Sequence, residues 1–360
     1  MQLSAKEVLQ KIVDNKASDL HLTIGLPPMM RVSSNLSTVP GYAALDSTTI
    51  EEFVFQILND VQEEKLKKEK EIDFSFSLGT KSRFRANAFY QKGFLAAAFR
   101  SIPYRVPTIE ELNLPSIITE FCKLPRGFVL VTGATSQGKS TSLAAMINHI
   151  NTNRSLHIIT IEDPIEYVFQ HDKSIIQQRE INQDTLSWRR ALRSVLREDP
   201  NVVLVGEMRD YETISATVTI AETGHLVFTT LHTNSASQAI NRMIDVFPDI
   251  QQAQVRAQLA DTIEGIISQR LIPAVDGGVV PAVEVLIANN AVRNTIREGK
   301  VHLIDNIINT NLELGMISLE RSLAQLVNEG KVPVETALAH TLKPDEVKRL
   351  VQNPNAKSKE

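Results

Sequence analysis

The sequence predicts an α/β protein in which a small α+β domain precedes a larger domain built on a parallel sheet. A length of 360 residues suggests about two domains, at roughly 150 residues each. From Gly127 onward, apolar strand-like runs alternate with helical segments, which is typical of a parallel sheet covered by helices. A glycine-rich loop joins one of these runs to the next helix. These three observations give the fold class.

The first domain combines helical spacing with short alternating strands. Apolar residues near the N-terminus follow helical spacing, and residues 48–70 read as one helix with a highly charged end. Alternating segments predict strands at 20–24, 73–78, 83–89 and 95–100. The boundaries that we expect are a first domain at 1–100, a proline-punctuated linker at 101–117, a second domain at 118–352 and a disordered tail at 353–360.

The second domain shows apolar strands of the kind that are buried on both faces of a sheet. We expect these strands at 128–132, 156–161, 202–205 and 226–231. Past residue 250, we expect helices to dominate.

Composition excludes several classes of protein. The net charge is −4, so no general electrostatic attraction to nucleic acid or anionic membrane is expected. The single cysteine, Cys122, forms no internal disulfide and no cysteine zinc cluster. The N-terminus lacks the pattern of a signal peptide, and no apolar run approaches the ~18 residues of a membrane span. We therefore expect a cytoplasmic protein without direct membrane insertion.

The strongest motif is the loop GATSQGKS at 133–140, which fits the Walker A pattern. An apolar strand leads into it and a helix leads out, as that motif requires. In this setting, loop amides and the helix N-terminus point at phosphate oxygens. Lys139 would reach the β- and γ-phosphates of ATP, and the Ser140 hydroxyl would bind Mg²⁺. The simpler interpretation is a glycine-rich turn. The candidate nucleotide-binding residues are Gly133, Ala134, Thr135, Ser136, Gln137, Gly138, Lys139, Ser140 and Thr141.

Three further predicted strands are followed by polar residues. In open parallel sheets, ligands bind beyond these carboxyl ends of the strands. Glu207 would hold Mg²⁺, directly or through water, and Glu166 or Glu162 would orient the attacking water. His232 would sense the γ-phosphate. Taken alone, each is weak, since acidic residues after strands often cap helices. Their repetition beside one phosphate loop favours a nucleotide site.

These segments resemble the type II/IV secretion ATPases. ITIEDPIEY at 159–167 is similar to their Asp box, LREDPNVVLVGEMRDYET at 196–213 to their Walker B region, and AETGHLVFTTLHTNSA at 221–236 to their His box. Within that superfamily the chain looks like the PilT-type ATPases of pilus retraction. The segments that carry this finer likeness are 17–32, 83–91, 268–273 and 291–301. The resemblance spans nearly the whole chain except its tail.

The resemblance implies a RecA-like P-loop ATPase domain preceded by a PAS-like domain. It implies a homohexameric motor that hydrolyses ATP with Mg²⁺ to retract type IV pili, as in twitching motility. Its expected location is the cytoplasmic side of the inner membrane, at the pilus base. Its expected partners are an inner-membrane platform protein and a PilU-like paralogue, with no nucleic acid.

The resemblance also assigns residues. Glu166 matches the family's catalytic glutamate and Glu207 its Walker B glutamate, while His225 and His232 match the histidines of the His box. Arginines of the first domain complete the family's site, and the best matches are Arg85 and Arg100, with Arg83 a third candidate. Arg83 and Arg85 lie two apart on a predicted strand and therefore share a face. The alternative for each arginine is a solvent-facing strand edge.

Two departures from the family concern the phosphate loop. The family usually reads GPTGSGKS, so Ser136 stands where glycine tolerates a positive φ, and Gln137 adds bulk beside the phosphates. This puts the rate of hydrolysis in question more than nucleotide binding. In the His box, Thr229 also replaces a usual glycine.

The segment 291–301 has two interpretations. It is a packing helix with solvated Arg293 and Arg297, or a basic face that transmits motion to a membrane partner.

Three other functions stay open. Arg189, Arg193 and Arg197 share a helix face beside Trp188 and would suit a DNA motor, although a subunit contact or a solvated face is the simpler interpretation. A pilus-assembly or type II secretion ATPase is disfavoured by the short N-terminal region and the single cysteine. A nucleotide-binding structural partner of another motor, as among PilU-like paralogues, is kept open by the altered loop.

Overall fold

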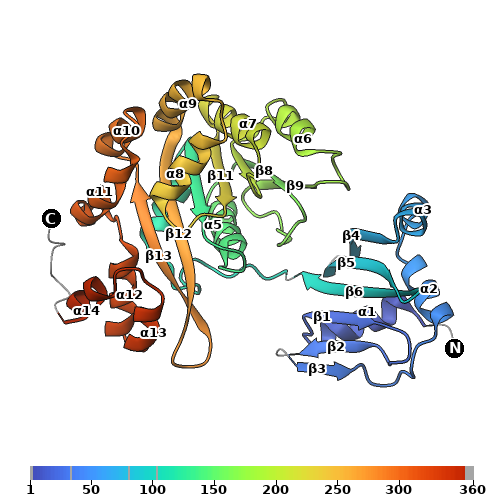
Figure 1. Cartoon of the computed structure of the whole chain (residues 1–360). Coiled ribbons are helices and arrows are strands. Elements are labelled where there is room, and N and C mark those ends of the chain that lie inside the picture. The colour runs from blue at the N-terminus through green and yellow to red at the C-terminus, as the bar shows by residue number, and fades with distance from the viewer. Residues whose placement is uncertain (1–2, 33–34, 80–81, 103, 353–360) are drawn as a thin grey trace. The chain divides into compact units, whose positions relative to one another are not determined.

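The computed structural model describes residues 3–32, 35–79, 82–102 and 104–352. The described chain divides by internal contacts into two compact units. The first contains residues 1–105 and 166–168, and the second contains 106–165 and 169–360. Each unit has its own sheet and its own apolar core (Figure 1). The predicted tail at 353–360 lies outside the described residues.

The sheet of the first unit has six strands in the order β3-β2-β1-β6-β5-β4, and neighbouring strands pair antiparallel. Its strands are β1 (Asp19–Leu22), β2 (Met29–Val32), β3 (Asn35–Thr38), β4 (Glu71–Leu78), β5 (Ser82–Gln91) and β6 (Phe94–Ile102). Its helices are α1 (Ala5–Asp14), α2 (Ser47–Phe55) and α3 (Asp60–Glu69). Apolar side chains from one face of the sheet and from α1 and α2 form the core. On β5, Phe84 and Ala86 point into this core, which leaves the intervening arginines on the opposite face.

The prediction of one helix over 48–70 was wrong. The chain forms two helices there, and the second begins at a new N-terminal cap. The Asn59 side chain accepts a hydrogen bond from the Gln62 backbone, and the Gln62 side chain accepts one from the Asn59 backbone. This reciprocal cap satisfies amide donors only at the start of a helix. The periodicity of the apolar residues alone did not reveal the break.

The sheet of the second unit has seven strands in the order β13-β12-β7-β11-β10-β8-β9. Its strands are β7 (Gly127–Thr132), β8 (His157–Glu162), β9 (Ile175–Glu180), β10 (Val202–Val205), β11 (Leu226–Leu231), β12 (Ile263–Pro273) and β13 (Val279–Ile287). All neighbouring pairs are parallel except β12 and β13. The carboxyl ends of β7, β11, β10 and β8 therefore meet at one edge.

Helices complete the second unit (Figure 1). In chain order they are α4 (Ile117–Lys123), α5 (Lys139–Asn153), α6 (Trp188–Val195), α7 (Tyr211–Glu222), α8 (Ala236–Asp245), α9 (Asp249–Thr262), α10 (Asn290–Arg297), α11 (Ile304–Thr310), α12 (Leu319–Asn328), α13 (Val334–Ala339) and α14 (Pro344–Gln352). Residues from α6 to α11 pack with those of the sheet in one large core. Helices α12 to α14 form a smaller core against β12 and β13.

Helices dominate past residue 250, as expected, but one pair of strands there was not predicted. The long hairpin of β12 and β13 lies among the helices and extends the sheet beyond β7. Its turn contains Gly277 at φ +89°, a conformation that glycine adopts without a steric penalty. The hairpin matters for the site, because β12 runs beside the phosphate loop.

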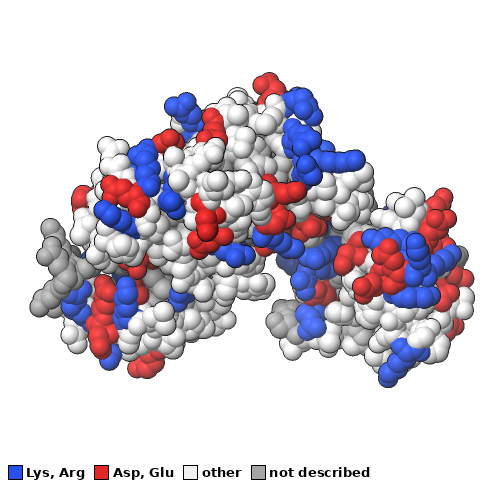
Figure 2. Space-filling model, turned by 45° about the horizontal axis from the view of Figure 1, so that its top comes forward, with Lys and Arg blue, Asp and Glu red and all other residues white. Residues whose placement is uncertain are grey.

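Charged side chains of both signs are interspersed on the face that Figure 2 shows. This fits the small net charge of −4 and gives no large field of one sign. In the part of the chain that the structure describes, no helix combines the length and the apolar character that crossing a bilayer requires.

Candidate functional site

The phosphate loop turns sharply between β7 and α5, and β12 lies close behind it. Gly133 has φ +151°, and a Cβ atom there would come within 2.4 Å of the Gln269 carbonyl oxygen. Gly138 has φ +76°, and its Cβ would stand 2.8 Å from Gln269 Nε2. Gly133 therefore requires glycine for space as well as for conformation, because it meets a backbone oxygen, whereas Gly138 is favoured by its positive φ. The loop is packed against the sheet and is not a free surface turn.

Lys139 is the first residue of α5 and is buried. Its ammonium donates hydrogen bonds to the carbonyls of Gly133 and Ala134, each at 2.8 Å. Burial lowers its pKa, while the negative charge of Glu207 acts in the opposite direction. A buried cation therefore stands inside the loop, bonded to groups that a phosphate could replace.

Glu207 and His232 come from neighbouring strand ends, and the structure brings them together. Glu207 follows β10 and His232 follows β11, with 3.1 Å between Glu207 Oε1 and His232 Nε2. Arg209 lies 2.9 Å from the other carboxylate oxygen. Burial alone would raise the pKa of Glu207, but Arg209 and His232 together lower it. The carboxylate is therefore held in its charged form.

His232 also lies next to the phosphate loop. Its Nδ1 is 3.5 Å from the hydroxyl of Thr135, the outer limit for a hydrogen bond. The imidazole thus stands between Glu207 and the loop, in a position to contact both the carboxylate and a group bound at the loop.

The end of β7 and the segment after β11 are tied by two threonines that flank these groups. Thr132 precedes Gly133, and Thr233 follows His232. The buried Thr132 hydroxyl donates to the Thr233 carbonyl at 2.5 Å and accepts from the Thr233 amide at 3.1 Å. This contact fixes the His232 segment relative to the phosphate loop.

Three further predicted residues make other contacts. His225 precedes β11 and thus stands at the other end of that strand from His232, where its Nδ1 is 3.0 Å from the Thr223 hydroxyl. Glu162 ends β8 and is buried, and it accepts a hydrogen bond from Thr160 at 2.6 Å. Glu166 is exposed and groups with the first unit. Their roles in hydrolysis stay predictions.

The arginines of the first unit lie in one row across the sheet. Arg85 on β5 is the direct cross-strand partner of Arg100 on β6, and Arg100 in turn is opposite Asp19 on β1. Arg100 is 2.9 Å from Asp19, and Arg31 on β2 also reaches that carboxylate at 3.7 Å. Like charges directly opposite on neighbouring strands destabilise a sheet. Arg85 also lies 3.9 Å from the carboxylate of Glu166. Three cations with two nearby carboxylates leave an excess of positive charge, which suits an anion.

Arg83 lies two residues before Arg85 and is oriented differently. It donates to the hydroxyl of Ser75 on β4 at 2.6 Å, so its guanidinium lies along the sheet surface.

The α10 segment differs from the prediction of solvated arginines. Arg293 is largely covered and donates to Glu264 at 2.9 Å and to the Ala260 carbonyl at 2.8 Å. Arg297 pairs with Asp261. Both arginines therefore contact the end of α9 or the start of β12. Arg293 is largely covered, which corrects its expected solvation, whereas Arg297 is exposed as expected.

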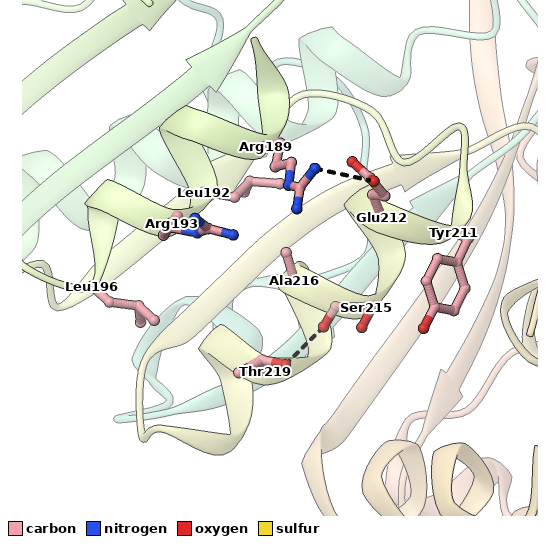
Figure 3. Close-up of a pocket in the computed structure, with 9 residues that line it drawn as sticks. All are labelled: Arg189, Leu192, Arg193, Leu196, Tyr211, Glu212, Ser215, Ala216 and Thr219. Atoms are coloured by element: carbon pink, nitrogen blue, oxygen red, sulfur yellow. Dashed lines mark hydrogen bonds and ion pairs between the residues drawn. The ribbon is translucent and has the colours of Figure 1, made fainter. Parts of the chain in front are cut away.

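A groove of about 360 Å³ lies between α6 and α7 (Figure 3). Its apolar lining comes from Leu192, Leu196 and Ala216, and Arg189 points across it to Glu212 at 3.8 Å. The lining residues are Arg189, Leu192, Arg193, Leu196, Tyr211, Glu212, Ser215, Ala216 and Thr219. An apolar groove with an aromatic side chain and an ion pair has the composition of a protein contact more than that of a phosphate-binding stripe.

Comparison with known proteins decides the family. The family model described as type II/IV secretion system protein matches residues 1–279. The chain belongs to this family. The type IV pilus retraction ATPase PilT of Pseudomonas aeruginosa is 46% identical over 331 residues, which cover 92% of this chain and 96% of that protein. The type IV pilus ATPase PilU of the same organism is 38% identical and covers 96% of this chain and 91% of its own length.

A solved structure agrees with these relatives. The crystal structure of the pilus retraction motor PilT with bound ADP matches with a TM-score of 0.90 at 44% identity. The match covers 96% of this chain and 99% of that chain. The likeness to PilT-type ATPases that the sequence motifs indicated is therefore confirmed, as is the mixed α/β fold.

Sequence reasoning missed several residues of the site. Arg209 stands only two residues after Glu207, so its position could have indicated a partner for that carboxylate. Thr132 and Thr233 flank predicted residues, but nothing in the sequence pairs them. Gln269 lies in the segment 268–273 that the family likeness singled out, but its contact with the loop was not predicted, because the strand that carries it was not.

We expect Thr132→Val to lower the free energy of unfolding of the second unit by about 1–3 kcal/mol, because it leaves the Thr233 amide without its acceptor. Thr229→Val is the matched control. Thr229 is equally buried on β11, and among the described residues its hydroxyl has no hydrogen-bond partner. Its replacement should leave stability unchanged or raise it. Chemical denaturation of both variants measures this, and equal losses would contradict the role of the Thr132 contact.

Proposed function

We propose that this chain is an ATP-hydrolysing motor that powers the retraction of type IV pili. The observation that carries the proposal is the cluster at one edge of the second sheet. There a buried Lys139 lies within the phosphate loop, and the Glu207–His232 pair lies beside it. The PilT and PilU relatives, and the ADP in the PilT crystal structure, support a nucleotide at this place.

The residues of the site fit MgATP. Bound MgATP supplies the γ-phosphoryl group that is cleaved and the cation that neutralises its charge. Lys139 would exchange its two loop carbonyls for phosphate oxygens, and the amides at the start of α5 would face the phosphates. Ser140 and Glu207 offer a hydroxyl and an ionised carboxylate, the hard oxygen ligands that Mg²⁺ prefers.

Activation of water needs a carboxylate near the γ-phosphate. We assign this to Glu166, with His232 hydrogen-bonding the γ-phosphate from its place beside Thr135. Glu162 is the weaker candidate, because it is buried and already accepts a hydrogen bond from Thr160. His225 lies at the opposite end of β11 from His232, so it would not act together with His232 at the γ-phosphate.

We further assign the row of Arg85 and Arg100 to the stabilisation of the transferring phosphoryl group. The repulsion between these two cross-strand cations is relieved when an anion binds between them. Arg83 is a less favoured candidate for this role, because its guanidinium already donates a hydrogen bond to Ser75.

The finer fold and the assembly are parts of the same proposal. The second unit would be a RecA-like domain over 118–352, and the first a PAS-like domain over 1–100, joined by the linker at 101–117. The chain would form a homohexamer on the cytoplasmic side of the inner membrane at the pilus base. Its partners would be an inner-membrane platform protein and a PilU-like paralogue, without nucleic acid. The groove between α6 and α7 is a candidate subunit contact.

A second candidate function is a nucleotide-binding structural partner of another motor. Ser136 at φ +63° favours it, since a strained phosphate loop could bind nucleotide without efficient turnover. A phosphate-release assay on the purified chain separates the two functions.

Lys139→Ala should reduce ATP turnover by about a hundredfold or more, because the loop loses the cation that stabilises charge on the phosphates. The fold should survive, since among the described residues the Lys139 ammonium donates hydrogen bonds to loop carbonyls alone. Lys173→Ala, at an exposed position of the same unit, is the control. Phosphate release and circular dichroism of both proteins make the measurement. Turnover of Lys139→Ala near that of the control would rule out the loop as the active site.

Arg100→Ala should lower kcat about tenfold or more, with nucleotide affinity nearly unchanged. The same substitution also breaks the ion pair with Asp19. Asp19→Asn breaks that pair while keeping the cation, and it should therefore retain hydrolysis. Steady-state kinetics and calorimetric binding of ADP distinguish the two variants. If both lose kcat equally, Arg100 has only a structural role.

A further inference from the structure

Strand β12 continues past the point where its neighbour β7 ends. The last residue of β7, Thr132, pairs with Ser268, and β12 then runs on to Pro273 paired only with β13. Beyond the end of β7, the Gln137 side chain lies beside β12 where the next residues of β7 would have paired. Its Oε1 accepts a hydrogen bond from the Leu271 amide at 2.6 Å. Gln137 thus satisfies an amide that β7 no longer reaches.

The backbone of Gln137 is tied to the same strand. Gln269 Nε2 donates to the Gln137 carbonyl at 2.7 Å, and Gln269 Oε1 accepts from the Ser142 hydroxyl at 2.7 Å. Gln269 is buried, so these bonds are shielded from water. The loop residue is therefore held at two atoms by alternate residues of β12. Its side chain turns toward Leu271.

The residue before this tether adopts an unfavourable conformation. Ser136 has φ +63°, in the left-handed region that residues with a Cβ atom populate only at a cost. Glycine populates this region about as readily as its mirror image. A loop with serine at this position therefore needs an external contact to keep the left-handed turn, and the adjacent Gln137 provides one.

We propose that Gln137 is a positioning residue, which docks the phosphate loop on β12 and holds Ser136 in the left-handed turn before nucleotide arrives. The inference deepens the proposed function and rests on nucleotide binding at this loop. Binding is favoured because the loop does not have to be ordered at the moment of binding. Without the tether, the loop amides leave their phosphate-facing orientation for part of the time.

The first test uses the nucleotide-free protein and so does not depend on the proposed function. Gln137→Met keeps the length of the side chain but removes the acceptor for the Leu271 amide. Hydrogen exchange at that amide should become about fivefold faster or more. Gln137→Glu retains an acceptor oxygen and should keep the slow exchange. Gln254→Met, at an exposed position on α9, is the matched control. Unchanged exchange in Gln137→Met would overturn the tether.

The second test measures binding of MgADP by calorimetry in two backgrounds. In the natural sequence, Gln137→Met should raise Kd roughly fivefold, the worth of one hydrogen bond. In Ser136→Gly protein the same change should raise Kd less than about twofold, because glycine keeps the turn without help. Equal losses in both backgrounds would overturn the coupling to Ser136. Failure of the unsubstituted chain to bind MgADP would instead contradict the proposed function, while the exchange experiment still decides the tether.

Discussion

The candidate site depends on the close approach between the phosphate loop and β12. Gly133 lies so near the Gln269 carbonyl oxygen that this position has no room for a Cβ atom, and Gly138 approaches the Gln269 side chain. The backbone of the loop can therefore face a ligand on one side while the sheet supports it on the other. Since β12 comes from the C-terminal half of the chain, two distant segments of the sequence build one surface. Helices α12 to α14 pack against β12 and its partner β13. Strand β12 therefore contacts both the phosphate loop and these C-terminal helices.

Charge is balanced around the loop by pairs that a nucleotide would replace. Lys139 is bonded to loop carbonyls, and Glu207 is held between Arg209 and His232. Burial makes the charges of Lys139 and Glu207 costly to leave without a partner. A phosphate group with its cation offers new partners to Lys139 and Glu207 together. The strand order supplies the geometry, because β7, β11 and β10 are neighbours and their carboxyl ends meet.

Local signals in the sequence were enough to predict the central strands of the second sheet and the phosphate loop. The runs at 202–205 and 226–231 match β10 and β11 because strands buried on both faces are continuously apolar. The hairpin of β12 and β13 was missed, because its apolar run lies among helical segments and periodicity does not separate the two. The break between α2 and α3 was missed because it depends on a reciprocal cap at Asn59.

Within the site, sequence reasoning found residues that follow strands but not the contacts between them. Glu207 and His232 were identified separately, and only the sheet order brings them to 3.1 Å. The contact of Gln137 with Leu271 was missed, because Leu271 stands 134 positions away and on a strand that was not predicted. The arginine row needed the register between β5 and β6, which fixes Arg85 opposite Arg100. Long-range pairing of this kind has no local signature.

The central claim is that nucleotide binds at the phosphate loop and meets the groups from β10 and β11. Hydrogen exchange of the whole chain, compared with and without MgADP, tests this claim directly because it reports every backbone amide. The account predicts slower exchange concentrated at residues 134–140 and in the segments that follow β10 and β11. Slower exchange that leaves the loop unchanged, and appears instead along the groove between α6 and α7, would contradict it.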